Sequence, residues 1–588
     1  MNIFNDFKKK LTEIILFLAE KHKVQISQQQ LSAFTVEPCK NSDHGDVATN
    51  IAMVCCKSFK TNPRQLAGII IEKVKEDQSV EKVEIAGAGF INVVFKNSLW
   101  HQFLLSVLQQ KEYKLPDLSD NKKINIEYAS PNPTGPMHVG HTRGAIYGDV
   151  LANLLEKTGF DVTREYYIND AGGQIATLIK SVYLRYLESL GEKIIIGEGL
   201  YPGEYLKPIA KKLKDKYSDS LKQMDEQEIY DQIRDFVIEE MMKIIKTDLK
   251  LLNIKHDNFF SEKQQLHDSG KIEQIVKELE QKGLIYKGSI EAPKGKKGKN
   301  YRPQEQLLFK STDFGDDSDR VVQTADGRYT YFAADIAYCL NKFQRGAEKI
   351  ILSVGFDHAG YVKRLNAALK AVTNDKAELK VILCQMVKFV KGGEPLKMSK
   401  RAGNFVTAAD LVKQVGADVM RFIMLTRKND APFDFDVNNV VEQSKDNPIF
   451  YVQYAHARCC SILRNLKEQI PDLPDLQNIV NQTPALEDLS VLQSGDDIEL
   501  IKKLAAYPRI IEMAVSNFEP HRIAFYLTEL AALFHSFWNK GIQDSNLRFI
   551  ISDNVPLTKA RIYLVIAISK IIASALSIFN IEPVQQMR

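Results

Sequence analysis

The chain carries two kinds of hydrophobic pattern, one with the period of a helix and one with the period of a strand. In the first 115 residues, a helical stretch at 63–74 is followed by alternating segments at 80–95, which predicts a small α+β domain. Further along, helical patterns separate strand-like runs at 122–130, 161–170, 349–355 and 379–389. This alternation predicts a parallel sheet with crossover helices.

The rest of the chain is dominated by helical periodicity. A polar, helical stretch at about 185–320 interrupts the α/β pattern and contains the Gly/Lys run 294–300, for which a solvated turn and a phosphate contact are both possible. From about 437 to 588 the pattern is helical throughout, which predicts an all-α bundle. We therefore expect a Rossmann-like α/β core at 116–436, with an α+β domain at 1–115 before it and a helical bundle at 437–588 after it.

Composition places the protein among globular chains in a reducing compartment. Of its 588 residues, 44% are hydrophobic and 26% charged, and the net charge of +4 permits a nucleic-acid partner without requiring one. The seven cysteines form no C-x-x-C pair, so neither a zinc site nor a disulfide framework is expected. The apolar run 562–579 has Lys570 near its middle, which favours a buried bundle helix over a membrane span. We expect a cytoplasmic protein with no membrane association.

The stretch "SPNPTGPMHVGH" at 130–141 directly follows a strand-like run. His138 and His141 are three residues apart, so a helix beginning near Pro136 would place both imidazoles on one face. A helix N-terminus offers unpaired N–H groups and a partial positive charge, and Gly140 would allow a flat ligand to approach the backbone closely. Two such histidines could also be ordinary surface groups, but this context favours a nucleotide site.

A second motif, "PLKMSKRAGNF" at 395–405, lies between a strand-like segment and a helix start. Lys397, Met398, Ser399 and Lys400 form a basic loop next to a glycine. A single loop of this kind is usually just solvated. Together with the histidine turn and an α/β core, it is not expected to arise by accident and favours a nucleotide site.

These two motifs, His-x-Gly-His and Lys-Met-Ser-Lys, are the signatures of class I aminoacyl-tRNA synthetases. The segments "YASPNPTGPMHVGHTRGAIYGD", "YFAADIAY" and "FDHAGYVKRL" and the final "QQMR" resemble the arginyl-tRNA synthetase family along essentially the whole chain. The resemblance implies that L-arginine is activated with ATP and Mg²⁺ and is transferred to tRNA(Arg). It also implies a tRNA-elbow module at 1–115 and an anticodon-binding bundle at 437–588. We expect a monomer without zinc.

The resemblance assigns roles in catalysis residue by residue. His138, His141, Lys397 and Lys400 are the expected catalytic residues, which stabilise the charge that develops on the leaving pyrophosphate. The expected ATP-binding set consists of Gly140, Met398 and Ser399 together with His138, His141 and Lys400.

Recognition of arginine requires carboxylates, because a guanidinium is always charged and pairs bidentately. The resemblance places Glu127, Asn132, Tyr331 and Asp335 at the arginine, with Asn132 on its α-amino end. For Glu127 the alternative is a surface charge at a strand end. Asp357 or His358 could fill one further position, and no general base for the transfer step is identified.

Two questions stay open at this level. On the first helix of the bundle, Tyr451, Tyr454 and His456 could stack on anticodon bases or belong to the helical core. Other possible functions are another class I synthetase, a small adenylyltransferase, and a non-enzymatic tRNA-binding relative. An acidic pocket disfavours glutamate, chain length disfavours a small adenylyltransferase, and intact His138, His141, Lys397 and Lys400 disfavour a pure binder. We expect removal of the first domain to leave the α/β core folded, because the core has its own strands, glycine turns and apolar helices. Because that domain lacks a nucleotide motif, its removal should lower tRNA affinity.

Overall fold

A computed structural model of the protein describes residues 1–39, 41–119, 121–289, 304–391, 394–395, 406–441, 447–470, 479 and 482–587. The chain divides into two compact units. Unit 1 combines Met1–Pro116 with Ser444–Arg588, and unit 2 is Asp117–Gln443. The two ends of the chain thus belong to the same unit.

The first part of unit 1 is an antiparallel sheet in the order β1–β2–β4–β3, packed with helices. Helix α1 begins after the N-cap Asn2, and its apolar residues recur every three or four positions and are buried, for example Phe7, Leu11 and Ile15. The elements are α1 (Ile3–His22), α2 (Gln28–Ala33), β1 (Val36–Pro38), η1 (Ser42–His44), β2 (Val47–Thr49), α3 (Ile51–Cys55), α4 (Pro63–Val74), β3 (Val80–Ala86), β4 (Phe90–Phe95) and α5 (Asn97–Leu108).

The second part of unit 1 is helical, as the sequence predicts. Its elements are α16 (Pro448–Gln469), α18 (Leu486–Leu489), α19 (Gly495–Ala505), α20 (Tyr507–Asn517), α21 (His521–Gln543), η6 (Ser545–Leu547) and α22 (Val555–Ile578). Helix α22 is long and apolar enough to cross a membrane, but 72% of its most apolar window is buried in the structure. It therefore packs as a core helix, and its Lys570 donates to the carbonyls of Leu108 and Gln110 at the end of α5.

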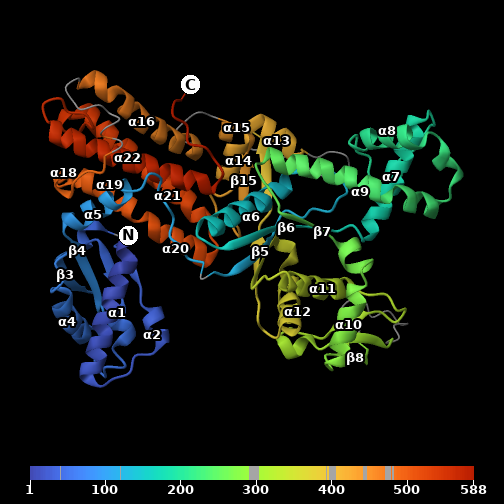
Figure 1. Ribbon diagram of the computed structural model, residues 1–588, viewed down its shortest axis with the longest axis horizontal. Coiled ribbons are helices and arrows are strands. Elements are labelled where there is room, and N and C mark those ends of the chain that lie inside the picture. The colour runs from blue at the N-terminus through green and yellow to red at the C-terminus, as the bar shows by residue number, and fades with distance from the viewer. Residues whose placement is uncertain are drawn as a thin grey trace. The chain divides into compact units, whose positions relative to one another are not determined.

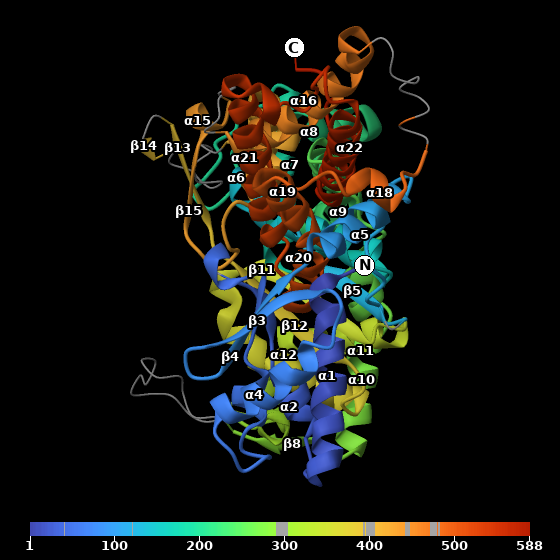
Figure 2. The same ribbon diagram turned by 90° about the vertical axis from the view of Figure 1, so that its left-hand side faces the viewer.

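Helix α5 joins the two parts of unit 1, because it packs against α18, α19 and α22 (Figure 2). Trp100, Phe103 and Leu104 on this helix are buried, and the ring of His101 is hydrogen-bonded through Nε2 to the carbonyl of Leu492, 2.9 Å away. The α+β part also contacts the bundle through an ion pair between Asp46 and Lys502.

Unit 2 is built around a parallel sheet in the order β12–β11–β5–β6–β7. Helices α11 and α12 pack with β11 and β12 in one hydrophobic core, and α6 covers the opposite face (Figure 1). This confirms the predicted parallel sheet with crossover helices. The elements are β5 (Lys123–Glu127), α6 (Val139–Lys157), β6 (Asp161–Ile168), β7 (Asn258–Ser261), α11 (Tyr331–Gln344), β11 (Lys349–Gly355), η5 (Phe356–Tyr361), α12 (Val362–Thr373) and β12 (Glu378–Cys384).

The range 185–320, expected to be one helical insertion, is interrupted by a strand of the main sheet. Its first part is helical, but β7 pairs in parallel with β6, and an antiparallel sheet β10–β9–β8 follows. The short apolar run "NFFS" is all that marks β7 in the sequence, which is too little to separate a strand from a loop. The elements are α7 (Gly173–Ser189), α8 (Leu206–Tyr217), η2 (Ser220–Gln223), α9 (Glu226–Leu251), η3 (Lys263–His267), α10 (Lys271–Gln281), β8 (Ile285–Gly288), β9 (Gln306–Phe309), η4 (Ser311–Phe314) and β10 (Arg320–Gln323). The Gly/Lys run 294–300 lies outside the described residues.

The last part of unit 2 carries a small sheet in the order β14–β13–β15. Strand β13 pairs in parallel with β15 and antiparallel with β14. Helix α13 follows, with Thr407 as its N-cap and Asp410 completing a capping box. The elements are β13 (Val387–Lys391), β14 (Glu394–Pro395), α13 (Ala408–Val415), α14 (Ala417–Ile423), β15 (Phe433–Asp436) and α15 (Val437–Val441).

Candidate active site

The histidine turn lies between the end of β5 and the start of α6. His138 is the N-cap, and its Nδ1 accepts a hydrogen bond from the Gly140 N–H at 3.1 Å. The His138 N–H in turn lies 3.3 Å from His141 Nδ1, and the two rings stack with centroids 3.6 Å apart. The i, i+3 prediction is therefore confirmed, although the helix begins at Val139 rather than near Pro136.

These hydrogen bonds define what the imidazoles can donate. Because Nδ1 of each ring accepts from the backbone, we assign the proton of the neutral imidazole to Nε2. A Cβ atom at Gly140 would lie 2.9 Å from His138 Cε1, so a larger residue there would displace the ring of His138 from this position. Both side chains are partly exposed at a helix N-terminus, an arrangement suited to binding an anion.

The chain just after the Lys-Met-Ser-Lys motif pairs with this turn. The Val139 N–H donates to the Val406 carbonyl at 3.3 Å, and the Ala408 N–H donates to the Met137 carbonyl at 2.8 Å. Lys397, Met398, Ser399 and Lys400 lie outside the described residues.

An acidic cavity of about 280 Å³ opens on the face of the sheet that carries α11 and α12. Three carboxylates line it, from three different elements: Glu127 at the end of β5, Glu262 just after β7, and Asp335 on α11. The other polar lining residues are Tyr167, Asn169, Tyr331, Tyr338, Lys342, His358 and Tyr361.

The three carboxylates differ in how their charges are compensated. Glu127 accepts from the buried Nζ of Lys342 at 2.6 Å, and Glu262 lies 3.2 Å from His267 Nε2. Among the described residues, no basic side chain lies within ion-pair distance of Asp335. Burial, with the charges of Glu262 and Glu127, raises the pKa of Asp335 from 3.8 to about 7. This carboxyl is therefore the one best placed to receive a cation.

Glu165, on the neighbouring strand β6, shows the opposite behaviour. Burial alone would raise its pKa, but the positive charges of Lys342 and Arg345 outweigh burial and hold the pKa at about 2. It also accepts a hydrogen bond from Tyr338 at 2.6 Å. Glu165 is thus already satisfied within the protein, whereas Asp335 faces the cavity without a counterion among the described residues.

The predicted arginine-binding residues do not all line this cavity. Tyr331 and Asp335 lie one helical turn apart on α11 and both line it, as does Glu127. Asn132 is not among its lining residues; its side-chain amide donates to Gln174 Oε1 at 3.0 Å. Of the two candidates that the sequence left open, His358 lines the cavity and Asp357 does not.

Sequence reasoning missed Glu262 and Lys342. Glu262 follows β7, which lay within the supposed insertion, so nothing marked it as a residue at the carboxyl edge of the sheet. Lys342 pairs with Glu127 across 215 positions of the chain, and no local pattern reports such a contact. Its position on the same helix as Asp335 was the only available signal.

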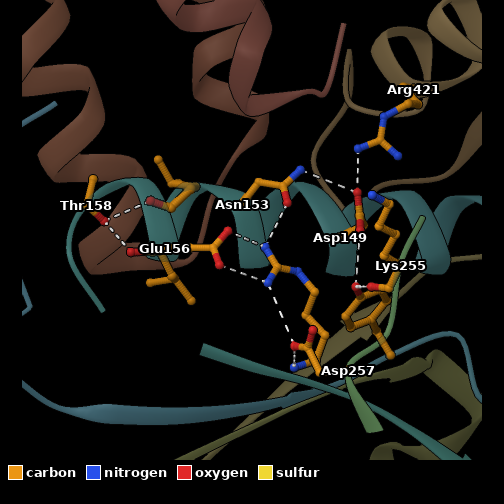
Figure 3. A network of polar contacts seen from close by, with 11 residues as sticks. Asp149, Asn153, Glu156, Thr158, Lys255, Asp257 and Arg421 are labelled. Atoms are coloured by element: carbon orange, nitrogen blue, oxygen red, sulfur yellow. Dashed lines mark hydrogen bonds and ion pairs between the residues drawn. The ribbon is translucent and has the colours of Figure 1, made fainter. Parts of the chain in front are cut away.

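A buried network anchors the residue after Glu127 (Figure 3). The hydroxyl of Tyr128 donates to Asp149 Oδ1 at 3.1 Å, and Arg421 donates to the other oxygen of Asp149 and to the carbonyl of Leu252. A Cβ atom at Gly148 would overlap the Tyr128 side chain at 2.3 Å. The end of β5, and with it Glu127, is therefore held by α6 and α14.

Comparison with known proteins covers the whole chain. Residues 2–95 match the arginyl tRNA synthetase N-terminal domain, 103–458 the catalytic domain of class I tRNA synthetases (R), and 452–587 the DALR anticodon binding domain. The arginine–tRNA ligases of Wolbachia pipientis wMel and Bartonella henselae are 49% and 50% identical over 588 and 591 residues, which is 100% of each chain.

Two solved structures share the fold. The arginyl-tRNA synthetase of Thermus thermophilus superposes with a TM-score of 0.72 at 19% identity, covering 99% of this chain and all of the other. The Plasmodium falciparum enzyme also superposes with a TM-score of 0.72, at 17% identity, covering 100% of this chain and 99% of the other. Taken with the motifs and the acidic cavity, these matches show that the chain belongs to the arginyl-tRNA synthetase family of class I aminoacyl-tRNA synthetases.

Proposed function

We propose that the protein activates L-arginine with ATP in the site formed by the acidic cavity and the histidine turn, and then transfers the arginyl group to tRNA(Arg). The observation that carries this proposal is the cavity itself, which Glu127, Glu262 and Asp335 line together with Lys342, the one Lys or Arg among its described lining residues. Such a site attracts a cationic side chain and repels an anionic one, so a glutamate-specific synthetase is disfavoured.

The guanidinium of arginine fits this geometry better than the ammonium of lysine. Its five donors lie in one plane and can contact carboxylates from more than one direction, whereas an ammonium is a single compact charge. We assign Asp335 as the principal partner, with Glu127, Glu262 and Tyr331 around it. Asn132 is retained for the α-amino end, since it follows β5 closely in the chain.

In the adenylation step, the arginine carboxylate attacks the α-phosphorus of ATP and pyrophosphate leaves. We propose that Nε2–H groups of His138 and His141 donate to the triphosphate at the N-terminus of α6, where the helix dipole adds attraction. Lys397 and Lys400 are proposed to neutralise the charge that builds on the leaving group. Met398, Ser399 and Gly140 complete the proposed ATP contacts.

We propose that a Mg²⁺ ion accompanies ATP and is held mainly by the nucleotide phosphates and water, as is usual for this ion. When bound, Mg²⁺ would share the negative charge of the phosphates.

Binding of tRNA is assigned to residues 1–115 at the elbow and 437–588 at the anticodon, nearly all of which belong to unit 1. In the bundle, the guanidinium of Arg458 lies 4.4 Å from the ring centre of Tyr454 and 4.7 Å from that of Trp538, a platform on which unpaired bases could stack. His456 is buried and hydrogen-bonded to Val584 and Ser569, so we assign it to the helical core and not to contacts with anticodon bases. We also propose that the protein is a cytoplasmic monomer without zinc.

The proposed function is tested by ATP–pyrophosphate exchange with each amino acid, with and without tRNA(Arg). Of the amino acids tested, we expect only arginine to support exchange. Exchange that prefers lysine, or that does not depend on an amino acid, would overturn the assignment of the cavity. Binding of tRNA(Arg) without any exchange would favour the non-enzymatic alternative.

A further inference from the structure

Arg143 is a buried cation two residues beyond the histidine turn, and among the described residues no carboxylate lies within ion-pair distance of it. It is 2% exposed. Other buried arginines in the chain are paired with carboxylates, as Arg421 is with Asp149 and Arg561 with Asp497. A buried charge without an ion pair destabilises the folded protein. The contacts that Arg143 makes are therefore expected to have a role beyond stability.

The guanidinium of Arg143 donates to backbone carbonyls in two loops, the one between β12 and β13 and the one between α14 and β15. Its Nη1 atom is 2.8 Å from the Ala431 carbonyl and 3.3 Å from that of Gln385, and Nη2 is 2.5 Å from the Lys428 carbonyl. Its Cζ lies 5.5 Å from the centre of the Phe433 ring, the first residue of β15. These carbonyls converge where β13 and β15 both begin, and the Gln385 N–H donates to the Asn429 carbonyl at the same point.

This contact joins the two halves of the proposed ATP site. Arg143 and the two histidines lie on the first turns of one helix, and five residues of α-helix span only about 7.5 Å. Strand β13 leads through β14 to Pro395, two positions before Lys397. On the far side of the motif, the chain at 406–408 pairs directly with 137–139.

We propose that Arg143 is a positioning residue for adenylate formation. Its guanidinium holds the base of the β13–β15 sheet on α6 and thereby fixes the strand that leads to Lys397 relative to His138 and His141. The inference rests on the proposed roles of those residues. It predicts no effect on the arginine cavity, whose carboxylates stand on β5, α11 and the segment after β7.

The test compares Arg143→Gln and Arg143→Lys with the matched control Arg185→Gln. Arg185 is a buried arginine in the same unit that also donates to a backbone carbonyl, that of Pro202 in the helical insertion. ATP–pyrophosphate exchange is measured with saturating tRNA(Arg) while arginine and ATP are varied, and thermal unfolding is followed in parallel.

We expect Arg143→Gln to lower kcat on the order of 100-fold, since a displacement of about 1 Å can cost that much, with the KM for arginine nearly unchanged. Arg143→Lys, which keeps the charge but not the planar fork, should recover part of the rate. Arg185→Gln should keep the kcat of the parent protein, even if its unfolding temperature falls as much as that of Arg143→Gln.

Two results would overturn the inference: an unchanged kcat in Arg143→Gln, or equal loss of kcat in both glutamine variants at equal loss of stability. If Arg143→Gln does not fold, Arg143→Lys decides, and full activity in that variant refutes the need for the fork. Lys400→Ala in the parent protein distinguishes a failure of the proposed function from a failure of the positioning role of Arg143. If it leaves kcat unchanged, the proposed function of the loop fails; if it lowers kcat while Arg143→Gln does not, only the positioning role fails.

Discussion

Replacing Asp335 with asparagine changes one atom of the acidic cavity and removes the charge that we assign to the guanidinium. In the empty cavity the ionised carboxylate is itself unfavourable, because its pKa is raised from 3.8 to about 7. That displacement corresponds to about 4 kcal/mol. Bound arginine offsets this cost, and the neutral amide cannot attract the guanidinium in the same way.

The expected magnitudes follow from these two states. Removing one member of a desolvated charge pair typically costs about 2 to 5 kcal/mol, or roughly 30- to several-thousand-fold in affinity. The KM for arginine in Asp335→Asn should rise by this factor, while the KM for ATP should change little. The control is Asp326→Asn, which removes an exposed carboxylate that pairs with Arg328.

The same variant should gain stability, and the gain should depend on pH. Between pH 3.8 and about 7 the folded protein retains a proton on Asp335 that the unfolded chain has released, so stability falls as pH rises through this window. Asparagine has no such dependence. The stability difference between Asp335→Asn and the parent should therefore shift in favour of the variant by about 2 kcal/mol between pH 5.5 and 8.

Pyrophosphate exchange with saturating tRNA(Arg) measures the Michaelis constants, and thermal unfolding at the two pH values measures the stability difference. Equal increases in the KM for arginine and for ATP would refute the assignment of the cavity. A stability difference that is the same at both pH values would show that the Asp335 carboxylate does not carry the buried charge.

Three further outcomes are expected. In the parent protein the KM for arginine should rise about tenfold for each pH unit below 7, because only ionised Asp335 binds well; a similar rise in Asp335→Asn would contradict this. Lys400→Ala should lower the rate of adenylate formation with little change in Michaelis constants, as expected for an interaction made in the transition state, and the assignment fails if only the Michaelis constants change. Deletion of 1–95 should weaken tRNA binding and leave the bundle folded, whereas deletion of 1–115 also removes α5, whose buried apolar side chains contribute about 1.5 to 3 kcal/mol each; equal unfolding temperatures of the two truncated proteins would argue against the contact.

The sequence was most informative where function depends on neighbours in the chain. The spacing of His138 and His141 predicted that their rings share a face, and the four-residue spacing of Tyr331 and Asp335 places them one turn apart on α11. Both features follow from helical periodicity alone.

Contacts between distant segments could not be predicted in this way. The pairing of Glu127 with Lys342 and the place of Glu262 depend on the order of strands in the sheet, which the pattern of a single short strand such as β7 does not encode. The same holds for α5, whose apolar side chains were assigned to the first domain although they face the last helices of the chain.

The position of α5 has a consequence for the synthesis of the protein. Roughly 390 residues separate its end from the start of α19, so at about 5 to 20 residues per second the ribosome needs roughly 20 to 80 s to produce the partner. Throughout that interval Trp100, Phe103 and Leu104 lack their final packing partners. A chain cut short by a premature stop would display this apolar face permanently, and would thereby present to chaperones and proteases the mark of an unfinished protein.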